Sequence, residues 1–196
     1  MTGFIGERSN RQVALVTDDF RLYHDLAPFF EAHGVQLLGL RPGEAVPDSV
    51  AVLLGGPPTD ARSVAVRPAR EATWIATMAK LDERGQRMAV IGVDPGQTFG
   101  LALLVDDAVY WWCTAHSVHD AVRYLLAWRD GLAPGSWQAR IGDGAPRQAF
   151  ALLQALRAAW PGLDVRLVPE HGSTPVSPRT DSRHTDAAIA IALRGA

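Results

Sequence analysis

The sequence predicts an α/β protein in which a small α/β unit precedes a larger unit built on a mixed five-stranded sheet. Apolar strand-like runs alternate with amphipathic helical segments from residue 11 to residue 86, which favours a parallel sheet. From residue 87, three apolar runs follow one another through short links, which is typical of an antiparallel meander. We therefore expect a domain over residues 11–86 and another over residues 87–196, after a loose tail over residues 1–10.

The elements of the first unit are bounded by turn and capping residues. Gly34 and Gly85 end the two amphipathic segments, as glycine commonly does after a helix. Asp18 and Asp19 end the first strand-like run and precede a helix, so they suit either a helix N-cap or a receiver-like phosphoacceptor, and we favour the N-cap. The predicted order is a strand at 12–19, a helix at 21–34, strands at 35–40 and 49–56, and a helix at 70–85.

The second unit has the element order βββ-α-β-α-β-α. Its helices show a period of three to four residues and its strands are apolar runs closed by acids or turns. This order describes a mixed five-stranded sheet with helices on its faces. The predicted strands are 87–94, 100–107, 108–115, 137–144 and 164–170, and the predicted helices are 119–131, 147–162 and 181–195.

Four acids lie where these elements end or begin. Asp94, Asp143 and Glu170 each close a strand, and Asp186 begins the apolar part of the last helix. Each has a plainer interpretation, as a turn residue or a helix cap. Because the carboxyl ends of parallel strands gather at one edge of a sheet, we expect the four to converge. Hard cations such as Mg²⁺ or Mn²⁺ prefer such oxygen ligands, and two ions can clamp a phosphodiester.

Three motifs in the second unit resemble a known family. "IGVDPGQTFGLAL" at 91–103 is similar to the first-strand motif of the RuvC-type Holliday junction resolvases of the RNase H-like superfamily. "VPEHGST" at 168–174 is similar to the acid-bearing segment of the YqgF-like branch, and "HTDAAIAIAL" at 184–193 resembles the final helix of both groups. Two features depart from the resolvases: Arg183 stands where they have a further aspartate, and they lack the N-terminal unit.

The resemblance implies an RNase H-like fold and a Mg²⁺- or Mn²⁺-dependent endonuclease with about two ions, acting on branched or structured DNA in repair or recombination. Asp94, Glu170 and Asp186 match motif positions as catalytic metal ligands, and Asp143 matches by location alone. A homodimer would suit symmetric incision of a junction.

Two arginines and a histidine near these acids are candidates for contact with nucleic acid or for proton transfer. Arg179 and Arg183 are expected to hold flanking phosphates of nucleic acid. His184, two residues before the last acid, could assist proton transfer or simply face solvent, and we favour solvent.

Other functions remain open at this point. An RNase H-type or other structured-RNA nuclease would use the same acids, and a non-catalytic nucleic-acid-binding module would keep the fold. A sugar-kinase or actin-like ATPase is less favoured, because residues 11–86 lack a second phosphate-binding motif. "LLGGPP" has no Gly-Lys-Ser/Thr ending and is not a P-loop.

Composition excludes few functions, but it indicates in which cellular compartment the protein is expected. The net charge is −2, with an acidic stretch at 88–137 and a more basic one at 138–196, which suits a phosphate partner only weakly. Cys113 is the single cysteine, so no intrachain disulfide can form. Apolar runs are too short to span a membrane and the N-terminus does not look like a secretory signal, so we expect a cytoplasmic protein with no membrane partner.

Overall fold

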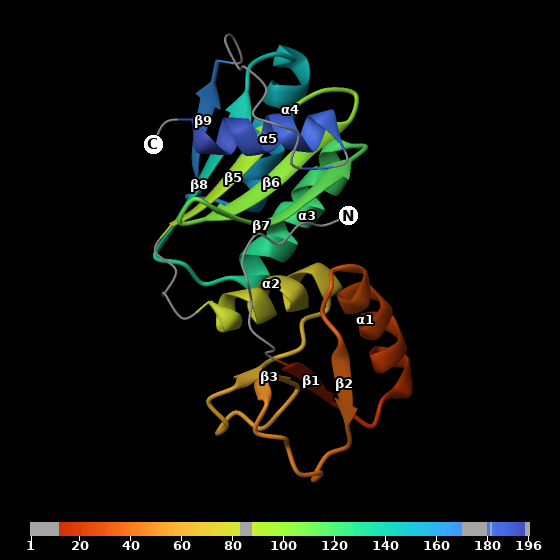
Figure 1. Ribbon diagram of the computed structural model, residues 1–196. Coiled ribbons are helices and arrows are strands. Elements are labelled where there is room, and N and C mark those ends of the chain that lie inside the picture. Colours follow the sequence, from red (N-terminus) through yellow and green to blue (C-terminus); the bar gives the residue numbers. More distant parts are fainter. Residues whose placement is uncertain (1–11, 83–87, 170–179, 181, 195–196) are drawn as a thin grey trace. The chain divides into compact units, whose positions relative to one another are not determined.

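A computed structural model of the chain describes residues 12–82, 88–169, 180 and 182–194 (Figure 1). The chain divides into two compact units, Met1–Arg84 with Asp130–Leu132, and Gly85–Arg129 with Ala133–Ala196. Within the described ranges, no helix has both the length and the apolar character needed to cross a membrane. Each unit has its own sheet, so the two are described in turn.

The first unit is a parallel four-stranded sheet with the order β2-β1-β3-β4. This order has β1 at its centre, so the chain leaves β1 toward β2 and then returns to the other side of β1. Doubly wound folds bind ligands near such a reversal, outside the carboxyl ends of the strands. The elements are β1 (Gln12–Val16), α1 (Phe20–Ala32), β2 (Leu37–Leu40), β3 (Val50–Leu54), β4 (Ser63–Val64) and α2 (Arg70–Leu81).

The two helices of this unit pack against each other through aromatic side chains. The ring of Phe30 from α1 lies 5.1 Å from that of Trp74 in α2, centroid to centroid, and both side chains are buried. Gly34 follows the end of α1 with φ of +78°, a left-handed conformation that favours glycine. Its N–H donates to the carbonyl of Glu31 at 2.9 Å, which satisfies one of the last free carbonyls of the helix.

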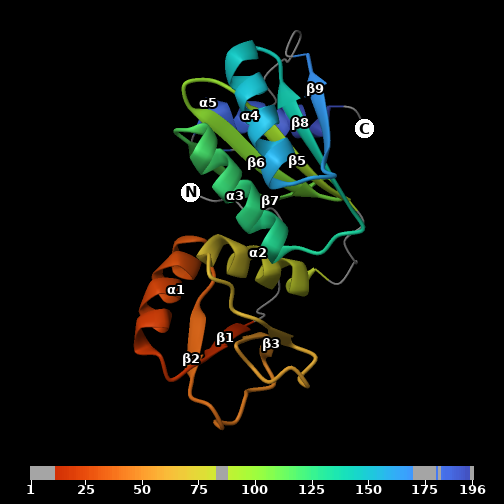
Figure 2. The same ribbon diagram turned by 180° about the vertical axis from the view of Figure 1, so that it is seen from behind.

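The second unit is a mixed five-stranded sheet with the order β7-β6-β5-β8-β9. β5, β6 and β7 form an antiparallel meander, whereas β8 and β9 add in parallel beside β5. Figures 1 and 2 show α5 on one face of this sheet and α3 and α4 on the other. The elements are β5 (Met88–Asp94), β6 (Phe99–Val105), β7 (Ala108–Ala115), α3 (Val118–Gly131), β8 (Ser136–Gly142), α4 (Pro146–Ala159), β9 (Asp164–Val168) and α5 (Arg183–Leu193).

Two glycines allow α5 to lie directly on the sheet. A Cβ atom on Gly92 of β5 would overlap the carbonyl oxygen of Ala188, and one on Gly100 of β6 would overlap that of His184. The small side chain of Ala192 also faces Gly92 and belongs to the apolar cluster beneath the helix. Close backbone approach therefore fixes where the first turn of α5 lies over the sheet.

The structure confirms the predicted α/β class, with a parallel four-stranded sheet and a mixed five-stranded sheet. The predicted order βββ-α-β-α-β-α of the second unit is also present. The two-residue strand β4 was not predicted, because Ser63 and Val64 form too short a run to show a period. The predicted tail at 1–10 lies outside the described residues.

Candidate functional site

Asp94 is the last residue of β5 and pairs across the sheet with Gly100 of β6. The first turn of α5 lies over Gly100, and this places Nδ1 of His184 at 3.1 Å from Oδ2 of Asp94. The Asp94 side chain is 16% exposed and that of His184 is 46% exposed. Burial raises the pKa of the Asp94 carboxyl, and the hydrogen bond and charge of His184 offset part of that rise.

The other predicted residues of the second unit are only partly placed. Asp143 is exposed and follows β8, whose register pairs Ile141 with Val93, so its strand ends at the same edge as Asp94. Asp186 lies half-buried in the first turn of α5, and Arg183, the first residue of that helix, is exposed. Glu170 and Arg179 lie outside the described residues.

Among the described residues, this site contains the acid–imidazole pair of Asp94 and His184. Within the described ranges, no group of three or more His, Cys, Asp or Glu side chains could hold a metal ion. The set predicted for Mg²⁺ or Mn²⁺ includes Glu170, which falls outside those ranges, so the two-ion site stays a prediction. His184, expected to face solvent, instead contacts Asp94 while remaining half exposed.

A second group of charged residues lies at the carboxyl edge of the first sheet. Asp19 is the N-cap of α1, where its Oδ1 accepts hydrogen bonds from the N–H groups of Arg21 at 2.8 Å and Leu22 at 3.3 Å. Its own N–H donates to Oγ1 of Thr17 at 2.9 Å. The favoured interpretation of this acid pair as a helix cap is therefore confirmed for Asp19. The carboxylate of Asp18 is exposed.

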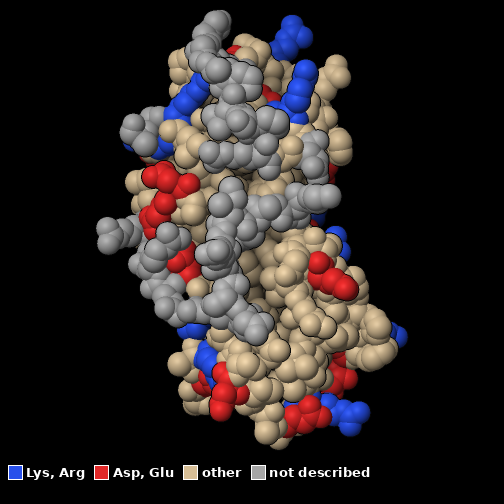
Figure 3. Space-filling model, viewed as in Figure 1, with Lys and Arg blue, Asp and Glu red and all other residues tan. Residues whose placement is uncertain are grey.

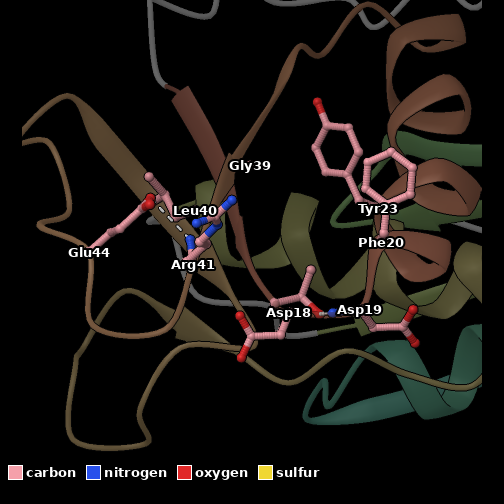
Figure 4. A pocket seen from close by; sticks show the side chains of 9 residues that line it. Asp18, Asp19, Phe20, Tyr23, Gly39, Leu40, Arg41 and Glu44 are labelled. Atoms are coloured by element: carbon pink, nitrogen blue, oxygen red, sulfur yellow. Dashed lines mark hydrogen bonds between the residues drawn. The ribbon is translucent and has the colours of Figure 1, made fainter.

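These acids border a cavity of about 570 Å³. Figure 4 shows Phe20 and Tyr23 projecting from α1 on one side of it, and Arg41 and Glu44 on the other. The lining consists of Thr17, Asp18, Asp19, Phe20, Tyr23, Gly39, Leu40, Arg41 and Glu44. Sequence reasoning missed the contribution of β2 and its following turn, although a parallel β1–β2 pair would have placed "RPGE" beside "TDD".

Comparison with known proteins bears on this first unit. Residues 12–90 match the model of a response regulator receiver-like domain. The match covers the whole parallel sheet, both of its helices and the first residues of β5. No curated protein and no solved structure showed significant similarity to the chain.

The family match corrects the functional prediction. The identification as an RNase H-like nuclease resembling RuvC-type resolvases and YqgF-like proteins is wrong, and so are the endonuclease function and its place in DNA repair and recombination. The physical reason is that acids at strand ends recur in α/β sheets with unrelated chemistry, as caps, turns or ion pairs. For residues 11–86, which lie almost entirely within the matched segment 12–90, the prediction weighed a receiver-like phosphoacceptor at Asp18 and Asp19 but favoured a helix cap and assigned the unit no function. The nucleic-acid partner and the homodimer stay predictions.

Proposed function

We propose that the first unit is a receiver-like signal-input domain that regulates the chain of which it is part. The observation behind this proposal is the parallel β2-β1-β3-β4 sheet with acids closing β1, in the same residues that match the receiver-like model. The order 2-1-3-4 corresponds to the first four strands of the flavodoxin-like order 2-1-3-4-5, which signalling receivers share. The input surface would be the carboxyl edge, where the cavity lies.

The strand-end chemistry favours a signal that binds without covalent transfer. β3, next to β1 in the sheet, is followed by Gly55 and Gly56, which offer no nucleophilic side chain. Asp19 is held by the first turn of α1, which leaves Asp18 as the available acceptor at this edge. A phosphoryl group there would add nearly two negative charges beside Asp19, with Arg41 lining the same cavity as the offsetting cation.

One face of the first unit carries charged side chains of both signs. On the face seen in Figure 3, acidic and basic side chains lie next to each other over the first unit. A nucleic-acid-binding surface instead gathers Lys and Arg on one face. On this face, the first unit therefore shows charges of both signs rather than a gathering of Lys and Arg.

Amide hydrogen exchange of the full chain tests the signalling proposal. Asp18→Lys reverses a charge at the proposed input edge, and Asp25→Lys makes the same change at another exposed position on α1. We expect Asp18→Lys, and not Asp25→Lys, to change exchange rates within residues 88–168, because an input domain must bias the rest of the chain. Equal exchange in both variants throughout 88–168 would overturn the proposal.

A phosphodonor experiment tests the absence of covalent transfer. After incubation with acetyl phosphate and Mg²⁺, intact-mass measurement should show the unmodified chain. A phosphoryl adduct that disappears in Asp18→Asn would contradict binding without transfer, and would make Asp18 the acceptor of an otherwise receiver-like domain.

For the second unit we propose a fold and no activity. Its sheet order β7-β6-β5-β8-β9 and its element order βββ-α-β-α-β-α support an RNase H-like topology. Since one fold hosts many unrelated functions, this topology gives no support to a particular chemistry.

A further inference from the structure

The cavity of the first unit combines two unlike charges from neighbouring strand ends. The N–H of Thr17, just after β1, donates to the carbonyl of Leu40, the last residue of β2, at 3.0 Å. The residue after Thr17 is Asp18, and the residue after Leu40 is Arg41. Each of the two residues therefore directly follows the last hydrogen-bonded position of the paired strand ends. Both residues are exposed, and both line the cavity.

These two charges differ from the other charged groups of the cavity in being unengaged. Asp19 accepts two backbone hydrogen bonds at the start of α1, and Oε2 of Glu44 accepts the backbone N–H of Arg41 at 3.1 Å. Among the residues that the structure describes, neither the carboxylate of Asp18 nor the guanidinium of Arg41 has a hydrogen bond or ion pair. Of the three carboxylates in the lining, Asp18 is therefore the one without a hydrogen-bond or ion-pair partner among the described residues, and Arg41 is the one cation of the lining.

Aromatic rings form the α1 side of the cavity. Tyr23 is held in place because its hydroxyl donates to the carbonyl of Leu37 at 3.3 Å and its ring lies against Gly39, where an added Cβ would be 3.0 Å from Cε2. Phe20 is 73% exposed, with its ring edge-to-face against His24 at 4.1 Å between centroids. A fixed ring and an exposed ring can accept an apolar group or the face-on approach of an ammonium ion.

We propose that this cavity binds a small zwitterion that carries an apolar or aromatic group. Its ammonium group pairs with Asp18, its carboxylate pairs with Arg41, and its side group lies on Phe20 and Tyr23. A free amino acid and a short peptide share this chemistry. A phosphate ester fits less well, because three carboxylates line the cavity against one guanidinium. The inference rests on the proposed function only in treating the bound zwitterion as the input signal.

Titration calorimetry of the full chain with matched probes tests the chemistry. L-Phenylalanine has both charges, phenethylamine lacks the carboxylate and 3-phenylpropionate lacks the ammonium group. We expect L-phenylalanine to bind at least about tenfold more tightly than either analogue, since each analogue leaves one charged group of the site unpaired. The dipeptide Phe-Phe separates the two sources: tighter binding of the dipeptide indicates a peptide ligand, and tighter binding of the amino acid a free one.

Variants locate the site. Asp18→Asn should weaken L-phenylalanine about tenfold or more, and Arg41→Gln should abolish the preference for L-phenylalanine over phenethylamine. The controls are Asp25→Asn, which removes a negative charge from α1, and Arg21→Gln, which removes a positive one. Neither residue lines the cavity, so both variants should bind L-phenylalanine as the wild type does. Gly39→Ala should weaken binding by displacing the Tyr23 ring.

Three results would overturn the proposal. These are no binding of either L-phenylalanine or Phe-Phe, equal binding of phenethylamine and L-phenylalanine, or binding unaffected by both Asp18→Asn and Arg41→Gln. Binding without any exchange response in residues 88–168 would contradict the signalling role alone. If Asp18→Lys changes amide exchange within residues 88–168 but the wild-type chain binds neither L-phenylalanine nor Phe-Phe, the ligand assignment alone is contradicted.

Discussion

Asp19 and Asp94 both stand where a buried strand gives way to the next segment, and the structure uses them differently. Asp19 is exposed and caps the helix that begins at the next residue, through two backbone hydrogen bonds. Asp94 is largely buried and contacts His184, which is 90 residues away in the chain. The comparison teaches that the role of a strand-end acid depends on the element that packs over it.

The elements that cover the two acids are positioned by different kinds of interaction. α1 follows β1 directly, so Asp19 meets its partners through local sequence and needs no tertiary contact. α5 reaches Asp94 only because Gly92 and Gly100 let its backbone lie against β5 and β6. Changes to tertiary packing should therefore affect the second unit more than the loss of a local cap affects the first.

The largest expected effect is that of Gly92→Val. The added side chain would overlap the Ala188 carbonyl and press on Ala192, so we expect a loss of about 3 kcal/mol or more in the free energy of unfolding. Urea unfolding followed by far-UV circular dichroism measures it. The control is Gly96→Ala in the loop after β5, where the closest atom outside the chain neighbours is the Thr98 carbonyl oxygen at 3.2 Å, with an expected cost within about 1 kcal/mol. Wild-type stability of Gly92→Val would contradict the close approach of α5.

A smaller effect is expected at the acid pair of the first unit. Asp19→Ala removes the acceptor for two N–H groups of α1 and should cost about 1 kcal/mol in the free energy of unfolding. Asp18→Ala removes an exposed carboxylate and should stay within about 0.5 kcal/mol of the wild type. Thermal and urea unfolding of the two variants, measured in parallel, separate the adjacent acids. Equal costs would show that the cap is not specific to Asp19.

The smallest effect, and the most pH-dependent one, is expected for Asp94→Asn. Because burial raises the pKa of Asp94 above its usual value near 3.8, the unfolded chain loses its proton first as pH rises. The ionised wild type is thereby destabilised above that pH, whereas the asparagine variant is not. Asp94→Asn should match the wild type near pH 3.8 and become modestly more stable as pH rises, until the folded carboxyl has also ionised.

Urea unfolding between pH 3.5 and pH 7 measures this difference, with Asp25→Asn as the exposed control. A stability gain in Asp94→Asn that shrinks as pH rises would contradict the burial argument. A gain of the same size in Asp25→Asn would assign the effect to net charge rather than to the position of Asp94.

The sequence predicted most elements because their signals are local. Apolar periodicity and the glycine stops placed the strands and helices, and the acid before "FRLYHDL" indicated a cap that Asp19 indeed forms. Function was harder to predict, because the acids that resembled a nuclease motif are short patterns shared by many α/β proteins. Residues 12–90, which matched a receiver-like model, offered only the acid pair Asp18 and Asp19 after a strand, a pattern that a helix cap explains as well.

The sequence by itself determined the α/β class, the two sheets and the residues available at each strand end. Tertiary structure alone decided which of those residues meet: Arg41 beside Asp18 through the parallel β1–β2 pair, and His184 against Asp94 through α5. Periodicity reports which face of an element is buried, but it contains no information about which distant element covers that face. That choice depends on long-range packing, here on the two glycines that admit α5 and on the strand order that places β2 next to β1.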